Sequence, residues 1–236
     1  MPRTVSPPRT ATAPDLRVET GLLGAGERLV AGCDEVGRGA LAGPVTVGVV
    51  VVDPAVAVLL EGPRDSKLLT AAAREALVEP IREWSLGWGV GHASPGEIDD
   101  VGLSAAVGLA GRRALEAASA VHRPDVVLVD GNYDWLSPKP QTSLFEAALT
   151  VAPEGADPGR AFPRVSTRIK ADLACLSVAA ASVLAKVERD RLMVQYHRDE
   201  PHFCWAENKG YGTEAHRAAL REHGPSPRHR RSWRLV

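Results

Sequence analysis

The run from Val45 to Val52 constrains the fold of this 236-residue chain more than any other segment. Six of its eight residues are valine and Thr46 is also β-branched, so all but Gly48 favour an extended backbone. Apolar residues do not alternate with polar ones here, which is typical of a strand buried on both faces. Such a strand predicts a sheet with helices packed on either side.

Further strands and helices are expected before and after this run. Thr70 precedes an apolar repeat of helical spacing, and the pair Ser94-Pro95 can open a helix. Three strands come first, and strands then alternate with helices. This order predicts an α/β domain with a mixed five-stranded sheet flanked by helices. The expected strands are 28–34, 45–52, 86–93, 126–129 and 164–169, and the expected helices are 69–84, one from 95, 105–120, 173–197 and 213–222.

The chain divides into three regions by composition. Residues 1–25 contain four prolines among Thr, Ala and Arg without an apolar period, which predicts a disordered leader. Residues 26–200 carry the strands and helices of the α/β domain, and within them the Pro- and Gly-rich residues 152–163 are expected to form a loop. Residues 201–236 are expected to form a helical, basic extension packed on that domain.

Positive charge gathers at the C-terminal end. The whole chain has a net charge of −1, but residues 186–236 hold 11 Lys or Arg against 7 Asp or Glu, a net +4. The dense stretch 228–234, Arg-His-Arg-Arg-Ser-Trp-Arg, suits contact with a phosphate backbone. A solvated basic tail explains the same composition equally well.

Other global features point to a protein of a reducing compartment. Cys33, Cys175 and Cys204 are far apart and form no CxxC pair, so neither a zinc site nor a disulfide framework is indicated. No uncharged apolar run approaches about 18 residues, and no signal peptide opens the chain. We therefore expect a cytoplasmic protein without a membrane partner, and a monomer.

Carboxylates recur where predicted strands end. Asp34-Glu35 follow the first strand, Asp130 closes the strand 126–129, and Asp172 lies between the last strand and the long helix. If the first and fourth strands are neighbours, Asp34 and Asp130 lie side by side at a sheet edge where ligands bind. Gathered carboxylates favour hard cations such as Mg²⁺ or Mn²⁺. Taken singly, each is more simply explained as a turn residue, and Asp172 as a helix cap.

Six segments of the chain, in this order, resemble the signature motifs of the ribonuclease HII family. The first is a long Asp-Glu-Val-Gly-Arg-Gly run, and the six together span about residues 28 to 232. Coincidence explains one short motif but not six in register. One departure is Ala171, where members of the family often have Gly. The segments are Cys33 to Val45, Asp65 to Leu68, Leu128 to Gly131, Lys170 to Asp172, Ala179 to Arg191 and Lys209 to Thr213.

This resemblance implies a ribonuclease H-like fold, with residues 26–200 as the catalytic domain and 201–236 as its extension. It implies two divalent ions, Mn²⁺ or Mg²⁺, held by four carboxylates, and a glycine-rich turn and a tyrosine that sense the ribonucleotide. A lysine near the substrate backbone is expected to contact phosphate. The implied catalytic and metal-binding residues are Asp34, Glu35, Asp130 and Asp172, and the implied substrate-binding residues are Gly37, Arg38, Gly39, Lys67 and Tyr211.

The activity implied by the resemblance is endonucleolytic hydrolysis of the RNA strand of RNA–DNA hybrids. It includes cutting 5′ of single ribonucleotides in duplex DNA, with 5′-phosphate and 3′-hydroxyl ends, in ribonucleotide removal from DNA. The partners are then the hybrid and the ribonucleotide-containing duplex, with contact to a replication clamp left open. The sequence does not decide which metal acts or what the leader does.

Two other functions compete with this one. A junction resolvase of the same fold also uses two metals, but the glycine turn at 37–39 together with Tyr211 argues against it. A non-catalytic nucleic-acid-binding module is the second, and four carboxylates argue against it because they repel a polyanion unless cations offset them.

Overall fold

The sheet is mixed and five-stranded, in a computed structural model that describes residues 13–138 and 161–236. Its strand order is β3-β2-β1-β4-β5. The first two pairings along the chain, β1 with β2 and β2 with β3, are antiparallel, whereas β1 with β4 and β4 with β5 are parallel. The α/β sheet expected from the sequence is therefore confirmed. The strands are β1 (Val30–Val36), β2 (Val45–Val52), β3 (Gly87–Ala93), β4 (Val126–Asp130) and β5 (Arg164–Arg168).

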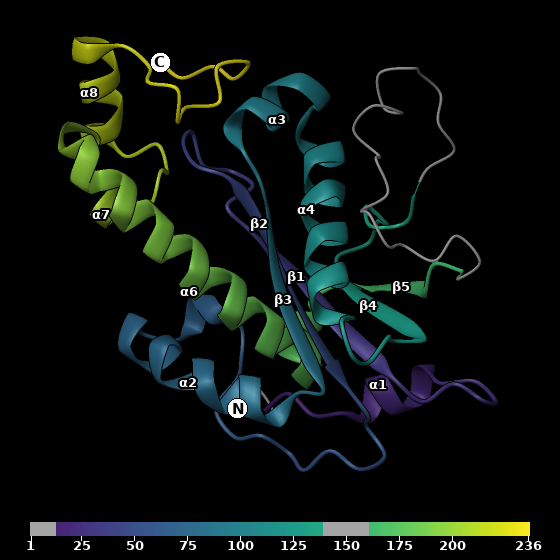
Figure 1. The fold of residues 1–236 in the computed structure, drawn as a ribbon. Coiled ribbons are helices and arrows are strands. Elements are labelled where there is room, and N and C mark those ends of the chain that lie inside the picture. Colours follow the sequence, from purple (N-terminus) through teal and green to yellow (C-terminus); the bar gives the residue numbers. More distant parts are fainter. Residues whose placement is uncertain (1–12, 139–160) are drawn as a thin grey trace, which may run out of the picture.

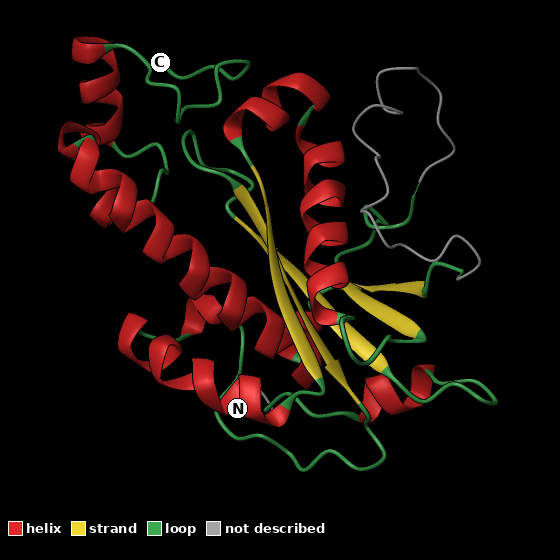
Figure 2. Ribbon diagram, viewed as in Figure 1, coloured by secondary structure: helices red, strands yellow, loops and turns green. Residues whose placement is uncertain are grey.

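Helices cover both faces of the sheet, as Figures 1 and 2 show. On one face α4 packs over β3 and β2, and on the other α6 crosses β1 and β2 with α2 alongside it. Thr70, Ser94 and Thr213 cap α2, α3 and α8 through their hydroxyl groups, as expected of such residues. The helices are α1 (Arg17–Leu22), α2 (Ala71–Trp84), α3 (Pro95–Val101), α4 (Leu103–Ala118), α6 (Leu176–Asp199), α7 (Trp205–Asn208) and α8 (Glu214–His223), with 3-10 turns η1 (Ser66–Leu68), η2 (Ala171–Leu173) and η3 (Pro201–Phe203).

Small residues let the two long helices approach the sheet closely. A Cβ added to Gly48 in β2 would lie 2.3 Å from the carbonyl oxygen of Ala181 in α6. One added to Gly89 in β3 would lie 2.2 Å from the carbonyl oxygen of Ala114 in α4. Backbone therefore packs directly on backbone, and the fully buried β2 has helices on both faces.

The prediction of a disordered leader is wrong for residues 13–25; residues 1–12 lie outside the described part of the chain. Residues 17–22 form α1, and the buried Glu19 accepts hydrogen bonds from the backbone N–H and the hydroxyl of Ser177, at 3.0 and 2.7 Å. Asp15 also pairs with the backbone around Cys175. Composition missed this helix because contacts with α6, distant in sequence, stabilise it.

The C-terminal residues pack on the α/β domain around an aromatic cluster. Phe203 and Trp205 are buried and stack with ring centroids 4.9 Å apart, and His216 and His229 lie edge-on to Phe203. The alternative of a solvated basic tail is wrong for His229 and Arg230, which are buried, and Arg228 pairs with acidic side chains, whereas Arg231 and Arg234 are exposed.

Two further expectations concern segments only partly described. Of the expected loop 152–163, residues 152–160 lie outside the described part of the chain. None of the helices in residues 13–138 and 161–236 combines the length and apolar character that a membrane crossing requires.

Candidate active site

Asp34 and Glu35 occupy consecutive positions near the end of β1. Successive side chains of a strand point to opposite faces, so the two carboxylates leave the sheet on different sides. Cys33 joins the core under α4, while Gly32 and Asp34 face α6. The Asp34 carboxylate is 7% exposed, with the hydroxyl of Ser182 from α6 beside it.

Asp130 lies next to Asp34, as the sequence predicts. The parallel register pairs Cys33 with Val129, so the following residues of β1 and β4 are neighbours. Asp130 then reaches Asp172, because its Oδ1 accepts the backbone N–H of Ala171 at 2.7 Å. Asp172 is buried in the short turn η2, four residues before α6 begins at Leu176. The ends of β1 and β4 and the turn η2 therefore lie together, and each carries one of these carboxylates.

The gathered carboxylates raise one another's pKa. Burial, then Glu35, then Asp130 and Asp172 raise the pKa of Asp34 to about 8. Burial and Asp130 also raise the pKa of Glu35, although its pairing with Arg38 opposes the shift. Burial and the charges of Asp130 and Asp65 raise the pKa of Asp172. Negative charge at this edge is therefore poorly compensated by the protein itself.

Lys67 is the cation that faces this cluster. Burial lowers its pKa, but the charges of Asp65, Asp34, Asp172 and Asp130 outweigh burial and raise the pKa above its ordinary value. Its side chain is 79% exposed and its ammonium lies 3.9 Å from Asp65. Lys67 is therefore within the field of the carboxylates and still open to an incoming phosphate.

The carboxylates fit hard divalent cations by their chemistry. Oxygen donors at high negative density are what Mg²⁺ and Mn²⁺ prefer. The Oε2 atom of Glu35 is buried without a hydrogen-bond partner, as an acceptor awaiting a cation would be. No three acidic, imidazole or thiol groups in the described residues are yet close enough to hold an ion. The Glu35 carboxylate accepts a hydrogen bond from Arg38 at 3.0 Å, and the Asp130 carboxylate accepts one from the N–H of Ala171. Both carboxylates are therefore bonded to protein groups.

The turn at residues 37–40 and Tyr211 lie together, as the sequence predicts. Gly37 has a φ of +86°, and a Cβ there would collide with the Arg189 side chain, so only glycine fits. Tyr211 Cε1 would lie 4.0 Å from a Cβ on Gly39. The backbone N–H groups of Leu41 and Ala42 both bond the carbonyl of Gly210, at 2.8 and 3.2 Å. Arg38, Gly39 and Tyr211 are exposed beside one another next to the carboxylates.

Three residues that support this site were not identified from the sequence. Ser182 bonds the hydroxyl of Ser66 at 2.9 Å and so joins α6 to the segment that carries Lys67. Arg189 and Arg230 are fully buried beneath the 37–44 turn. Of the three, Ser182 and Arg189 lie inside one of the six motifs, and that position is their only signal in the sequence.

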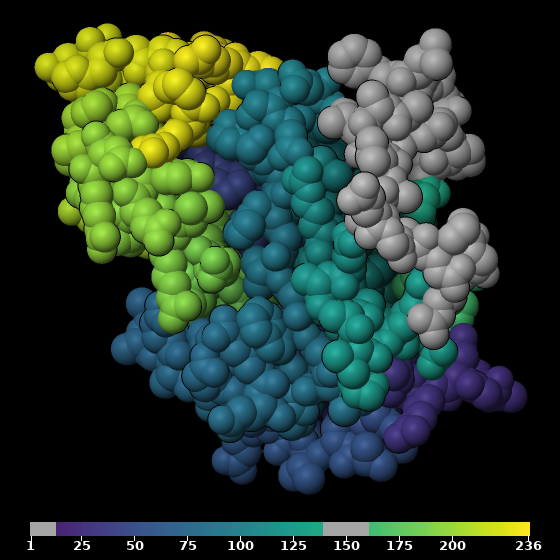
Figure 3. Space-filling view, in the orientation of Figure 1, coloured from purple at the N-terminus to yellow at the C-terminus, as the bar shows by residue number. Residues whose placement is uncertain are grey.

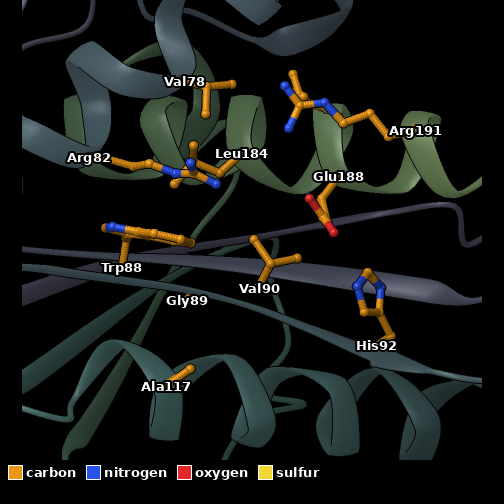
Figure 4. Close-up of a pocket in the computed structure, with 11 residues that line it drawn as sticks. Val78, Arg82, Trp88, Gly89, Val90, His92, Ala117, Leu184, Glu188 and Arg191 are labelled. Atoms are coloured by element: carbon orange, nitrogen blue, oxygen red, sulfur yellow. The ribbon is translucent and has the colours of Figure 1, made fainter.

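One hollow of the described structure lies away from these residues. A cavity of about 340 Å³ lies between α2, α6 and β3, with Arg82 stacked over Trp88 and with His92 and Glu188 further along it (Figure 4). None of the nine predicted site residues lines it.

The fold and the four carboxylates define a metal-dependent ribonuclease of the ribonuclease H class. A family model described as ribonuclease HII matches residues 31–236. The chain belongs to the ribonuclease HII family, endoribonucleases that act on RNA–DNA hybrids.

Known members of the family align with nearly all of the chain. The chain is 42% identical over 231 residues to a ribonuclease HII of Streptomyces avermitilis, covering 96% of this chain and 84% of that protein. The ribonuclease H2 structure from Pyrococcus horikoshii superposes with a TM-score of 0.62 at 28% identity, covering 88% and 94% of the two chains. The ribonuclease HII of the Archaeoglobus fulgidus PCNA complex superposes with a TM-score of 0.61 at 25% identity, covering 88% and 96%.

Proposed function

We propose that this enzyme cuts 5′ of single ribonucleotides embedded in duplex DNA, as well as within the RNA strand of longer hybrids, leaving 5′-phosphate and 3′-hydroxyl ends. Its role would be ribonucleotide removal from DNA. One observation carries the proposal: β1 leads directly from Asp34 and Glu35 into the exposed turn beside Tyr211. One rigid element thus carries both the carboxylates of the reaction and the groups that meet the sugar.

Asp34, Glu35, Asp130 and Asp172 would hold two divalent ions, Mn²⁺ or Mg²⁺. Such ions supply activation of a water and stabilisation of the leaving oxygen. The protein contributes the placement: parallel strands set Asp34 beside Asp130, and the Ala171 N–H holds Asp130 against the segment of Asp172. Lys67 offers an exposed ammonium to the substrate phosphate.

The turn at 37–40 and Tyr211 would recognise the ribonucleotide. The N–H groups of Arg38 and Gly39 have no acceptor among the described residues, so both can donate to the sugar or its phosphate. The 2′-hydroxyl is the group that distinguishes RNA from DNA at such a contact. The ring of Tyr211 would pack on the deoxyribose that follows the ribonucleotide.

The test is incubation of the protein with a duplex that contains one ribonucleotide, with Mg²⁺, with Mn²⁺ or with EDTA. We expect one cut, on the 5′ side of the ribonucleotide, with either metal and none with EDTA. Cleavage of an all-DNA duplex at a similar rate would instead indicate a resolvase-like nuclease. Binding without cleavage in any metal would indicate a non-catalytic module.

A second experiment with the purified protein tests whether it binds a sliding clamp and whether it is a monomer. The Archaeoglobus fulgidus relative was solved in complex with PCNA, so a sliding clamp belongs among the candidate partners of this chain. We propose that the free protein is a monomer. Size-exclusion chromatography with light scattering, with and without a clamp protein, measures both the oligomeric state and the complex.

A further inference from the structure

Arg230 is a buried cation without a carboxylate partner. Its side chain is completely buried, and it forms no ion pair within the described residues. Its guanidinium instead stacks at 4.9 Å from the ring of Trp233. Burial and the nearby charge of Arg189 lower the pKa of Arg230 to about 9. A buried charge is costly, so its hydrogen-bond partners show what it stabilises.

All hydrogen-bond partners of this guanidinium are carbonyls of the turn that follows β1. It donates to the carbonyl of Gly37 at 2.6 Å, to that of Arg38 at 2.7 Å and to that of Gly43 at 3.2 Å. Figure 3 shows the yellow C-terminal residues against this indigo part of the surface. A planar fork with five donors can reach several carbonyls at once, which a single ammonium cannot.

The direction of these carbonyls fixes the direction of two N–H groups. In a planar trans peptide the C=O and the following N–H point opposite ways. Because Arg230 draws the carbonyls of Gly37 and Arg38 inward, the N–H groups of Arg38 and Gly39 point outward. Both are unpaired within the described residues, and both residues are exposed beside Tyr211. Successive N–H groups of this kind form a concave donor site.

We propose that Arg230 is a positioning residue for sugar recognition: it aims the N–H groups of Arg38 and Gly39 at the ribonucleotide without touching it. Arg189 supports the other end of the same turn. It donates to the carbonyls of Pro44 at 2.9 Å and Ala42 at 3.1 Å, and to that of Lys209 at 2.8 Å in the segment of Tyr211. This inference rests on the proposed function, in which the N–H groups of the 37–40 turn bind the ribonucleotide.

The test compares Arg230→Lys with Arg228→Lys, both made in an Asp130→Asn background in which the duplex is bound and not cut. Arg228 is two residues away on the same segment, but its side chain pairs with Asp199 and Glu200 and not with the turn. For each protein, Kd is measured in Mg²⁺ for a one-ribonucleotide duplex and for the same duplex in all-DNA form. The ratio of the two Kd values isolates sugar recognition.

We expect the parent and Arg228→Lys proteins to bind the ribonucleotide duplex about tenfold more tightly than all-DNA. Arg230→Lys should bring that ratio close to one with little change in the Kd for all-DNA, because the buried guanidinium makes no phosphate contact. An unchanged ratio, or an equal loss on both duplexes, would overturn the inference. A ratio of one in the parent would overturn the proposed sugar reading as well.

A second variant covers the case in which Arg230→Lys does not fold. Trp233→Leu removes the partly buried ring on which the guanidinium stacks and leaves every carbonyl partner in place. We expect a smaller fall in the same Kd ratio, with thermal unfolding confirming a folded protein. A ratio equal to that of the parent would count against Arg230 as a positioning residue.

Discussion

At the scale of single residues, Asp130 has two roles. Its negative charge belongs to the carboxylate cluster, and its Oδ1 accepts a hydrogen bond from the backbone. Asparagine at this position keeps the oxygen that accepts the N–H of Ala171 but removes the negative charge. Asp130→Asn should therefore fold and bind duplex, while cleavage of the one-ribonucleotide duplex falls by about a thousandfold or more. Steady-state cleavage and an equilibrium binding assay measure the two effects separately.

Asp125→Asn is the matched control for that substitution. Asp125 lies just before β4 and likewise accepts backbone N–H groups, from Arg28 and Leu29 at 2.8 and 2.9 Å. Asp125 lies at the opposite end of β4 from Asp130, away from the carboxylate cluster. Its substitution should therefore leave kcat unchanged. Near wild-type cleavage by Asp130→Asn would remove Asp130 from the active site.

Tyr211 should contribute to recognition of the junction at which a ribonucleotide is followed by a deoxyribonucleotide. Its ring is 38% exposed and lies beside Gly39, so it can pack on a sugar at the turn. Tyr211→Ala should lower kcat/KM for the one-ribonucleotide duplex on the order of tenfold, and more than for a long hybrid. Tyr211→Phe should be milder because it keeps the ring. Equal losses on both substrates would leave Tyr211 as a general positioning residue.

At the scale of elements, the packing of α4 on β3 depends on a missing side chain. Gly89→Ala would place a Cβ 2.2 Å from the Ala114 carbonyl, so the helix must shift. We expect the free energy of unfolding to fall by about 2 kcal/mol. Gly96→Ala is the control, because its Cβ would meet only Ser94 Oγ at 3.9 Å. Urea unfolding checks both, and equal stabilities would mean that α4 has room to move.

Local sequence signals predicted the elements well. The β-branched run became β2 with its expected bounds, and Thr70, Ser94 and Thr213 begin helices. The expected adjacency of Asp34 and Asp130 followed once β1 paired with β4. These features depend on neighbouring residues or on one strand pairing, which a periodic pattern specifies.

Long-range contacts account for what the sequence did not predict. Helix α1 is six residues long and depends on Glu19 meeting Ser177, 158 positions away. Arg189 and Arg230 look like surface cations in the sequence, yet both are buried because the turn's carbonyls are their partners. No local period encodes such partners. The roles assigned to the four carboxylates and to Tyr211 remain predictions that rest on motif and geometry together.

At the scale of the whole molecule, two buried imidazoles connect the C-terminal segment to Tyr211. His216 faces the Tyr211 carbonyl through Nδ1 at 2.9 Å, and its Nε2 lies 3.0 Å from Nε2 of His229. The Nδ1 of His229 accepts the N–H of Ser226 at 3.0 Å. The carbonyl requires a proton on Nδ1 of His216, and Nε2 of His216 accepts the indole N–H of Trp205 at 3.2 Å, so the proton between the two rings belongs to His229. Both rings are therefore neutral in this network.

Acid should weaken this connection. Burial, then the neighbouring His216, lowers the pKa of His229 to about 4, below its unfolded value of about 6.5. The unfolded chain then binds more protons between these pH values, so stability is complete above about pH 6.5 and falls as the pH drops toward 4. The expected loss is roughly 3 kcal/mol in urea unfolding.

A matched pair of variants assigns that loss to the buried ring. The stability difference between the wild-type protein and His229→Phe should narrow as the pH falls, since phenylalanine cannot take up the proton. Gly96→Ala changes no titratable group, so it should keep a constant stability difference from the wild-type protein over the same range. A constant difference for His229→Phe would show that His229 does not titrate differently in the folded state.

The contact between Arg230 and Gly37 has a consequence for synthesis of the protein. The two residues are 193 positions apart, so the ribosome makes the 37–40 turn long before the Arg230 side chain that bonds its carbonyls. Strands β1 and β2 can pair early, but the turn between them lacks the Arg230 contact until that residue has emerged from the ribosome. Contacts of such separation form late in folding. If Arg230 positions this turn as proposed, a nascent chain, or one truncated before Arg230, would carry its carboxylates without selecting for a ribonucleotide, and selectivity would be acquired only after Arg230 has emerged.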